Sequence, residues 1–415
     1  MMRRAESITL AQGASSTVIQ QPLRGLRVID LTRVLAGPFC TLTLADMGAE
    51  VIKIELPGRG DDSRSYPPMI PDSEDSGYFW RANRGKKSVT IDLRRPEGAA
   101  LLVDLARRSD VLVENFAPGT IDRYGIGYEV LSAANPRLIL CSISGFGQAG
   151  PMAAAPAYDI VAQALSGMMS ITGLAGGEPV RCGVSIGDLT AALYGVIAIL
   201  GALRGREQTG RGQHLDIALL DCQVALLEDA LSRYSVLGTV PGPLGSRHPS
   251  ITPFQQFRSS DGFFVVAVGN EELWKQFCQA IELPNLRSDA RFVSNAQRTS
   301  NHAELEQLLQ DHFLLRPRRH WLDRLEAAKV PCAPISDLSE VSRNPHLHAR
   351  NMILKADHPT FDGLIVPGSP LKTVGDDEIP DTRAPALGAD TDEVLGSLLK
   401  IGQERLTELR QSGII

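Results

Sequence analysis

Short runs of β-branched and aliphatic residues alternate with helical patterns through the first half of this chain of 415 residues. Such alternation is typical of βαβ units, in which a helix connects each strand to the next strand of a parallel sheet. Two intervening stretches, 38–49 and 96–109, carry apolar residues at three- and four-residue spacing and predict helices. The pattern therefore predicts the α/β class with a mainly parallel sheet. The strands are predicted at 27–31, 51–55, 88–93, 110–115 and 138–144.

The character of the chain changes after its middle. A long amphipathic helix is predicted at 189–206, and one more strand and helix follow it. Residues 237–254 are dense in proline, glycine and serine, which indicates a linker. A smaller unit then opens with a predicted hairpin that turns at Asp261 and Gly262 and continues through helices. A last helix is predicted at 391–402.

Composition narrows the class of protein. The formal net charge is −6 and no long run of lysine or arginine occurs, so nucleic acid is not an expected partner. No stretch reaches the ~20 uninterrupted apolar residues of a membrane span, so a membrane is not expected either. The six cysteines lie far apart without metal-ligand spacing, which predicts reduced thiols, no metal and a cytoplasmic location. Arg3 and Arg4 leave a mitochondrial presequence, and so the matrix, as the alternative to a flexible tail.

Two loops have residues that could hold a phosphate. Gly145, Gly147 and Gly150 follow a strand in the dinucleotide-binding pattern G-x-G-x-x-G, but Pro151 argues against a helix that opens at the third glycine. A simple glycine turn is the favoured interpretation. The loop NRGKKS, residues 83–88, offers three cations to a phosphate-bearing ligand, and solvated surface charge is the favoured alternative.

Asp188 is the only carboxylic acid in CGVSIGDLTAALYG, residues 182–195. Apolar residues recur at helical spacing after it, so Asp188 is predicted at the N-cap or in the first turn of the long helix. An acid there stabilises a helix by accepting free N–H groups and complementing the dipole. The same position suits a carboxylate nucleophile, because the dipole would keep it ionised and Gly183 and Gly187 leave room for a substrate. These residues alone leave both roles open.

Nine motifs occur in order over nearly the whole chain, residues 23 to 400: LRGLRVIDLTRVLAGPF, GAEVIKIELPGRGDDSR, NRGKKSVTIDLRRPEG, DVLVENFAPG, SISGFGQAGP, AYDIVAQALSG, VSIGDLTAALYG, TGRGQHLDIALLD and RAPALGADTDEVL. Together they resemble the class III CoA-transferase family. The resemblance implies a large Rossmann-like domain made from both chain ends, a smaller α+β domain and an interlocked homodimer. The expected parts are a flexible tail at 1–22, the large CoA-binding domain at 23–225, a linker and small domain at 226–335, and a return segment at 336–415 that completes the large domain.

The resemblance also implies a mechanism. The catalytic aspartate of the family corresponds to Asp188, which would attack an acyl-CoA thioester and then carry CoA as a covalent aspartyl-CoA thioester. Asp159 corresponds to a family acid near the active site. The coenzyme A thioester is a substrate, and no permanently bound cofactor is expected. Two arginines among the CoA-binding positions, at 94 and 123, are expected to bind phosphates. The family positions that bind CoA correspond to Val34, Leu35, Ala36, Ile91, Arg94, Asn115, Phe116 and Arg123.

Departures from the family pattern bear on the substrate. An arginine that some members have after IKIE is replaced by Leu56, which puts one phosphate or adenine contact in doubt. The α-methylacyl-CoA racemases of the family have a histidine base where this chain has Tyr158, which disfavours racemisation. The glycine run of formyl-CoA transferase is replaced by GSRHPS, which argues against formate or oxalate as the acceptor. Asp390 replaces a histidine present in many relatives.

The GSRHPS stretch looks most like that of succinyl-CoA-dependent dicarboxylate transferases, including the glutarate type. Arg247 and His248 are therefore candidates to bind a distal carboxylate, with an ordinary surface loop as the alternative. The expected activity moves CoA from an acyl-CoA donor such as succinyl-CoA to a carboxylic acid acceptor such as glutarate, itaconate, malate or mesaconate. The alternatives are an α-methylacyl-CoA racemase-type isomerase and a non-catalytic acyl-CoA-binding protein.

Overall fold

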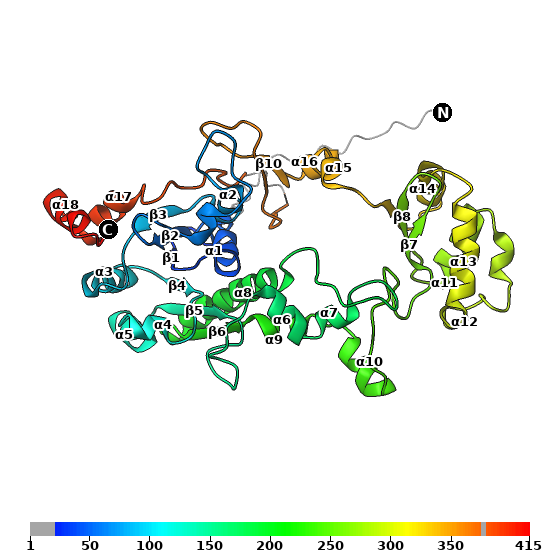
Figure 1. The fold of residues 1–415 in the computed structure, drawn as a ribbon, viewed down its shortest axis with the longest axis horizontal. Coiled ribbons are helices and arrows are strands. Elements are labelled where there is room, and N and C mark those ends of the chain that lie inside the picture. Colours follow the sequence, from blue (N-terminus) through cyan, green and yellow to red (C-terminus); the bar gives the residue numbers. More distant parts are fainter. Residues whose placement is uncertain (1–20, 375–378) are drawn as a thin grey trace, which may run out of the picture.

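A sheet of six parallel strands forms the centre of the larger part of the molecule (Figure 1). The structure is a computed structural model and describes residues 21–374 and 379–415. The strand order is β3-β2-β1-β4-β5-β6, so the order reverses between β1 and β4. The predicted α/β class with a mainly parallel sheet is confirmed. The strands are β1 (Arg27–Asp30), β2 (Glu50–Glu55), β3 (Lys87–Thr90), β4 (Val111–Glu114), β5 (Ile139–Ser144) and β6 (His214–Ala218).

Alternating side chains of the strands are buried in two separate cores. Ile29 of β1 lies in the core that α3 (Pro96–Ala106) covers. Its neighbour Val28 lies in the second core, together with α1 (Ala36–Asp46) and α8 (Ile186–Thr209). Because successive residues of a strand point to opposite faces, helices cover both faces of the sheet. The larger part is therefore a three-layer arrangement of helices, sheet and helices.

The long helix α8 crosses the second core and has Asp188 in its first turn. It is the predicted helix 189–206, extended by three residues at each end. Its Gly195 lies so close to α1 that an added Cβ would be 3.2 Å from Cys40 Sγ. Among the described residues, α8 is the one helix long and apolar enough to cross a membrane, and 44% of its apolar window is buried. Buried core helices can also be this long and apolar. The sequence predicts no stretch of this kind, so α8 is an exception to that prediction.

A smaller unit lies at the opposite end of the molecule from β3, and extended segments lead to it and back (Figure 1). Its antiparallel sheet contains β7 (Phe254–Arg258), β8 (Phe263–Ala267) and β9 (Cys332–Pro334). The hairpin predicted around Asp261 and Gly262 is confirmed by β7 and β8. Its helices are α11 (Glu271–Ala280), α12 (Asn295–Ser300), α13 (His302–Phe313) and α14 (Arg318–Ala327), around a core with the aromatic residues Phe257, Phe264, Phe277, Phe313 and Trp321.

The C-terminal segment returns to the larger part, where two helices complete the first core. The predicted last helix is α17 (Thr391–Leu399), which contacts β3 and α3. The apolar pattern does not predict α18 (Gln403–Gln411), because only two leucines of this helix are buried. The third strand ends at Thr90, earlier than predicted, because the chain then turns to the C-terminus, where the N–H of Asp92 donates to the Ile414 carbonyl at 2.8 Å.

Short elements connect these parts. The hairpin of β10 (Ile353–Lys355) and β11 (Ile365–Pro367) packs against α2 (Gly77–Asn83). Most of the tail predicted at 1–22, with its presequence alternative, lies outside the described residues. The remaining helices are α4 (Thr120–Arg123), α5 (Tyr128–Ala134), α6 (Asp159–Leu165), α7 (Met168–Ile171), α9 (Leu219–Ala225), α10 (Ala230–Leu237), α15 (Leu338–Ser342) and α16 (Pro345–Ala349), with 3-10 turns η1 (Asp62–Ser65) and η2 (Pro284–Arg287).

Candidate active site

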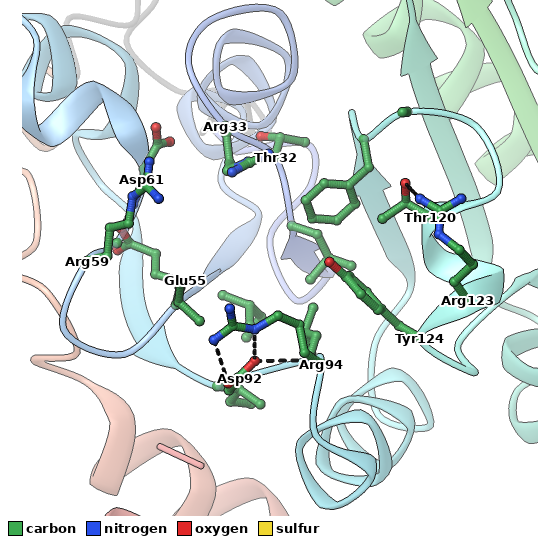
Figure 2. A pocket seen from close by; sticks show the side chains of 18 residues that line it. Thr32, Arg33, Glu55, Arg59, Asp61, Asp92, Arg94, Thr120, Arg123 and Tyr124 are labelled. Carbon is green, nitrogen blue, oxygen red and sulfur yellow. Dashed lines mark hydrogen bonds and ion pairs between the residues drawn. The ribbon is translucent and has the colours of Figure 1, made fainter. Parts of the chain in front are cut away.

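A cavity of about 440 Å³ opens at the carboxyl ends of β1, β2, β3 and β4 (Figure 2). It lies where the strand order reverses, which is where parallel α/β sheets bind ligands. The loops that follow the four strands supply its walls. The lining residues are Leu31, Thr32, Arg33, Ile54, Glu55, Leu56, Arg59, Gly60, Asp61, Ile91, Asp92, Leu93, Arg94, Phe116, Ala117, Thr120, Arg123 and Tyr124.

Guanidinium groups outnumber carboxylates around this cavity. Arg94 forms an ion pair with Asp92 at 2.8 Å, so part of its charge is balanced (Figure 2). Arg123 has no acidic partner among the residues that the structure describes, and its Nη2 donates to the Thr120 hydroxyl at 2.8 Å. An unbalanced guanidinium at the end of a parallel sheet suits a phosphate. Arg123 is therefore the strongest candidate phosphate ligand of the cavity.

The predicted CoA-binding residues divide into two groups. Four of them do not line the cavity: Val34, Leu35, Ala36 and Asn115. Four of them do line it: Ile91, Arg94, Phe116 and Arg123.

Sequence reasoning did not find three further residues of the cavity wall, which are Arg33, Arg59 and Tyr124. Arg59 comes three residues after Leu56, the position where the resemblance leads one to expect an arginine, and both line the cavity. Leu56 therefore does not leave this wall without a cation. The nearby arginine in PGRG is the signal that could have shown it.

All three cations of the loop 83–88 form ion pairs, and only Lys87, which pairs with Glu50 at 3.2 Å and Glu393 at 2.9 Å, is partly exposed as the favoured interpretation of surface charge predicts. Arg84 is buried and forms an ion pair with Asp46 at 2.6 Å. Lys86 is buried and forms an ion pair with Asp30 at 2.9 Å. Neither side chain is solvated surface charge and neither is free for a phosphate, because each neutralises an internal carboxylate.

The glycine pattern after β5 forms turns rather than a phosphate site. Gly147 and Gly150 have positive φ angles of 85° and 102°, which glycine adopts without strain. The next helix, α6, begins only at Asp159. No helix opens at the third glycine, and the glycine-turn interpretation is confirmed.

Asp188 lies in the first turn of α8 beside a second, buried carboxylate. The backbone N–H of Gly187 donates to Asp159 Oδ1 at 2.8 Å, and Gln163 Nε2 donates to Asp159 Oδ2 at 2.7 Å. A Cβ at Gly187 would lie 2.2 Å from Gln223 Nε2, so a glycine is needed for this close approach. In the described parts of the chain, no hydrogen bond or ion pair engages the Asp188 carboxylate. A carboxylate is thus held near a like charge and away from cations.

Burial and, to a smaller extent, the charge of Asp159 together raise the pKa of Asp188 to about 7. The prediction that the helix dipole keeps Asp188 ionised is therefore wrong. A helix dipole favours an anion by about 0.3–1 kcal/mol, whereas each unit of pKa corresponds to about 1.4 kcal/mol, so desolvation outweighs the dipole. The predicted place in the first turn is confirmed, with Ser185 at the N-cap.

Tyr78, in the first turn of α2, is affected by the charges of both Asp188 and the cavity residue Asp61. Burial raises the pKa of the Tyr78 hydroxyl, and the nearby charges of Asp188 and, to a smaller extent, Asp61 raise it further. Asp61 lines the cavity, and its Oδ1 accepts the N–H of Val34 at 3.1 Å. Both Asp188 and a carboxylate of the cavity wall therefore act electrostatically on Tyr78.

The remaining candidates make no hydrogen bond or ion pair to Asp188 among the described residues. Tyr158 is the N-cap residue of α6. Its side chain makes no capping hydrogen bond and is 81% exposed. Arg247 lines a second cavity of about 430 Å³ with His302 of the smaller unit, and the His248 ring packs on Phe254 at 5.3 Å. Within the described residues, neither Arg247 nor His248 bonds to Asp188. A single chain does not bring the predicted acceptor site to the candidate nucleophile.

Comparison with known proteins agrees with this geometry. The family model described as CoA-transferase family III matches residues 23–391. An acetyl-CoA:oxalate CoA-transferase from Acetobacter aceti is 44% identical over 358 residues, 86% of this chain and 90% of the relative. A succinyl-CoA:glutarate CoA-transferase from Mus musculus is 38% identical over 395 residues, 95% of this chain and 90% of the relative. The crystal structure of a CAIB/BAIF family protein from Brucella suis matches with a TM-score of 0.81 at 38% identity, covering 91% of this chain and all of that one. The chain belongs to CoA-transferase family III and is a CoA-transferase.

Proposed function

We propose that this protein transfers CoA from succinyl-CoA or a similar acyl-CoA to a dicarboxylic acid, with Asp188 as the nucleophile. The observation that carries the proposal is a partly buried carboxylate that has no cation partner among the described residues, in a chain whose cavity at the sheet edge has excess guanidinium charge. The relatives named for oxalate and for glutarate are 44% and 38% identical to this chain. Sequence similarity therefore does not distinguish a short dicarboxylate acceptor from a longer one. Oxalate, which GSRHPS argues against, therefore belongs with glutarate, itaconate, malate and mesaconate among the acceptors to test.

In the proposed reaction, the Asp188 carboxylate is bonded in turn to the donor acyl group, to CoA and to the acceptor acyl group. An Asp188 oxygen attacks the thioester carbonyl, the C–S bond breaks, and CoA leaves as a thiolate from a mixed anhydride. The thiolate attacks the Asp188 carbonyl carbon, which releases the donor acid and leaves an aspartyl-CoA thioester. The acceptor carboxylate attacks that thioester and releases the thiolate, which then attacks the acceptor carbonyl. The new acyl-CoA leaves, and the Asp188 carboxylate is free again.

Withdrawal from water suits both the nucleophile and the anhydride. A carboxylate that is partly withdrawn from water and has no cation partner among the described residues is a stronger nucleophile than a fully solvated one, once it is ionised. The raised pKa means that the anion forms above about pH 7. A poorly hydrated site also protects the anhydride from hydrolysis.

The cavity at the sheet edge binds CoA in this proposal, with Arg123 and Arg94 toward its phosphates. Replacing Arg123 with Ala is expected to raise KM for acyl-CoA about tenfold or more, because a charge-assisted hydrogen bond contributes about 1.5–3 kcal/mol. Arg94→Ala is expected to have a smaller effect, because the Arg94 guanidinium already forms an ion pair with Asp92 and its side chain is 60% exposed. Arg107→Ala, at an exposed arginine of the surface, is the matched control.

The active form that we propose is an interlocked homodimer, which supplies the acceptor site that a single chain does not assemble. Large apolar side chains are exposed on α8 and α10 and just after α10, which is unusual for a free surface. Arg247 then binds the distal carboxylate of the acceptor, with His248 beside it. Arg247→Ala is expected to raise KM for dicarboxylates far more than for monocarboxylates. The exposed residues are Leu193, Ile197, Leu231, Tyr234, Val236, Leu237 and Val240.

A covalent adduct at Asp188 is the direct test. The protein is incubated with succinyl-CoA, treated with hydroxylamine or borohydride, and the modified residue is mapped by mass spectrometry. Modification is expected at Asp188 and is expected to vanish in Asp188→Ala together with transfer activity. Asp221→Ala, which removes another first-turn acid, is the matched control and should behave like wild type. Modification elsewhere, or full activity of Asp188→Ala, would refute the proposal.

The two alternative functions make distinct predictions. A racemase-type isomerase would introduce solvent deuterium at the acyl α-carbon without an acceptor acid, and Tyr158 provides no ordinary base for this. A non-catalytic acyl-CoA-binding protein would give no exchange with any acid of the panel. We place the protein in the cytoplasm, with the mitochondrial matrix as the alternative, and CoA thioesters as substrates rather than as bound cofactors.

A further inference from the structure

Val34 has a left-handed backbone conformation, with φ at 69°. A β-branched residue rarely adopts this conformation, because its Cβ substituents crowd the backbone. Such strain persists only where the surroundings hold it, and it occurs most often at functional sites. Val34 lies in the turn of residues 32–34, between β1 and the start of α1.

Two buried side chains hold this turn from the β2 side. Asp61 Oδ1 accepts the N–H of Val34 at 3.1 Å, and Lys53 Nζ donates to the carbonyl of Thr32 at 2.7 Å. Lys53 and Asp61 form an ion pair with each other at 2.8 Å, and both side chains are fully buried. The two bonds to the turn therefore come from one rigid unit, in which each member fixes the other.

Asn115 holds the same turn from the end of β4. Its Oδ1 accepts the N–H of Arg33 at 2.8 Å, and its Nδ2 donates to the carbonyl of Arg33 at 2.9 Å. Both polar atoms of the amide are therefore engaged by the backbone of one residue. This use of Asn115 differs from the direct contact with CoA that the family resemblance implies.

The turn lies between the two halves of the candidate active site. Thr32 and Arg33 line the cavity on one side. On the other side the turn leads into α1, which packs against α8, the helix that carries Asp188. A displacement of the turn would therefore move the cavity wall relative to Asp188.

We propose that Asn115 and the Lys53–Asp61 pair are positioning residues, which hold residues 32–34 in a strained turn that sets the place of the CoA thioester relative to Asp188. The inference rests on the proposed function, because it takes the cavity as the CoA site and Asp188 as the nucleophile. Displacing reacting groups by about 1 Å can slow a reaction by about a hundredfold. Loosening the turn should therefore slow acyl transfer more than it weakens CoA binding.

Replacing Asn115 with Ala releases one side of the turn without touching the buried ion pair. Its kcat is expected to fall about tenfold or more while KM for succinyl-CoA stays within about threefold, and the rate of adduct formation at Asp188 should fall with kcat. Asn135→Ala removes an asparagine that bonds the carbonyls of Ala106 and Ser109 in another loop, and serves as the matched control. Wild-type kcat in Asn115→Ala, or a change in the unfolding temperature alone, would overturn the inference.

A second substitution tests whether backbone strain is involved. Glycine adopts a left-handed conformation at no steric cost. In Val34→Gly, a turn that has lost the Asn115 bonds therefore has no strain at position 34 that would drive it out of this conformation. The double variant Asn115→Ala/Val34→Gly is expected to recover at least about threefold in kcat over Asn115→Ala. No recovery would show that the strain has no part in the positioning. If Asp188 is modified in wild type and equally fast in Asn115→Ala, the inference fails and the proposed function stands. If Asp188 is never modified, the proposed function itself fails.

Discussion

Asp30, at the end of β1, is fully buried and Asp188, in the first turn of α8, is partly buried, and the neighbours of the two carboxylates differ in charge. Asp30 is fully buried and contacts Lys86 at 2.9 Å, with Lys53 nearby. Burial would raise the pKa of Asp30, but the two lysines and hydrogen bonds from threonines hold it well below the ordinary value. Within the described part of the chain, Asp159 is the one charge that shifts the pKa of Asp188, and burial together with this like charge raises that pKa to about 7.

The difference teaches how one fold separates a structural carboxylate from a reactive one. Burial disfavours the anion at both sites, so the neighbouring charges decide the outcome. Around Asp30, cations and hydroxyls satisfy the oxygens and make the carboxylate unreactive. At Asp188 the oxygens remain unpaired among the described residues, so the anion keeps its nucleophilicity. A perturbed pKa beside a cavity marks a candidate functional group in this way.

The largest expected effect separates the two sites by stability. Asp30→Asn leaves the buried Lys86 without its carboxylate and is expected to lower the free energy of unfolding by about 3–5 kcal/mol. Asp188→Asn removes a carboxylate that has no cation partner and is expected to cost no stability at pH 8. Urea unfolding followed by circular dichroism measures both. Asp221→Asn, at an exposed acid, is the control and should stay within about 0.5 kcal/mol of wild type. Equal destabilisation at positions 30 and 188 would contradict the comparison.

The two carboxylates also show which features of the structure the sequence predicts and which it does not. Hydrophobic alternation predicts the six strands and the helices α1, α3 and α8, because burial of one face leaves a period in the sequence. The partners of buried charges leave no such period. Lys53 lies inside a strand and meets Asp61 of the following loop, and Lys86 meets Asp30 of a strand 56 residues earlier. Two cations of residues 83–88, Arg84 and Lys86, form buried ion pairs for this reason, and the sequence does not show it.

The candidate site shows the same limit. The sequence places Asp188 in a helix start, because capping and helical spacing are local signals. Its acidity depends on burial and on Asp159, which tertiary structure alone brings near it. Arg33 and Arg59 line the cavity because loops after two different strands converge there. The topology predicts that loops converge at this edge of the sheet. It does not predict which side chains of those loops face the cavity.

The second prediction tests the origin of the raised pKa through kinetics. Because the anion is the nucleophile, kcat/KM for succinyl-CoA is expected to rise with pH through about 7 and then to level. Asp159→Asn removes the like charge while keeping an oxygen to accept the Gly187 N–H. The rise is expected to move to lower pH by about one unit, without reaching the ordinary range, since burial is the larger cause. Asp221→Asn should leave the profile in place. A rise near pH 4 in wild type, or an unchanged profile in Asp159→Asn, would contradict this account of Asp188.

The smallest expected effect concerns stability and pH. An acid whose pKa is higher in the folded than in the unfolded protein keeps its proton on folding, so the folded state loses relative stability as pH rises from the unfolded pKa toward the folded one. For Asp188 this interval runs from about 4 to about 7. Wild type and Asp188→Asn should therefore have similar free energies of unfolding at pH 4, and the variant should become more stable by about 1 kcal/mol at pH 8, allowing for partial solvent screening. Urea unfolding of both proteins at the two pH values measures the gap. Asp30 predicts the opposite sign, since a carboxylate with a depressed pKa adds stability as pH rises. A wild type that becomes more stable than Asp188→Asn as pH rises would therefore place Asp188 in the same class as Asp30, and the distinction between the two carboxylates would be lost.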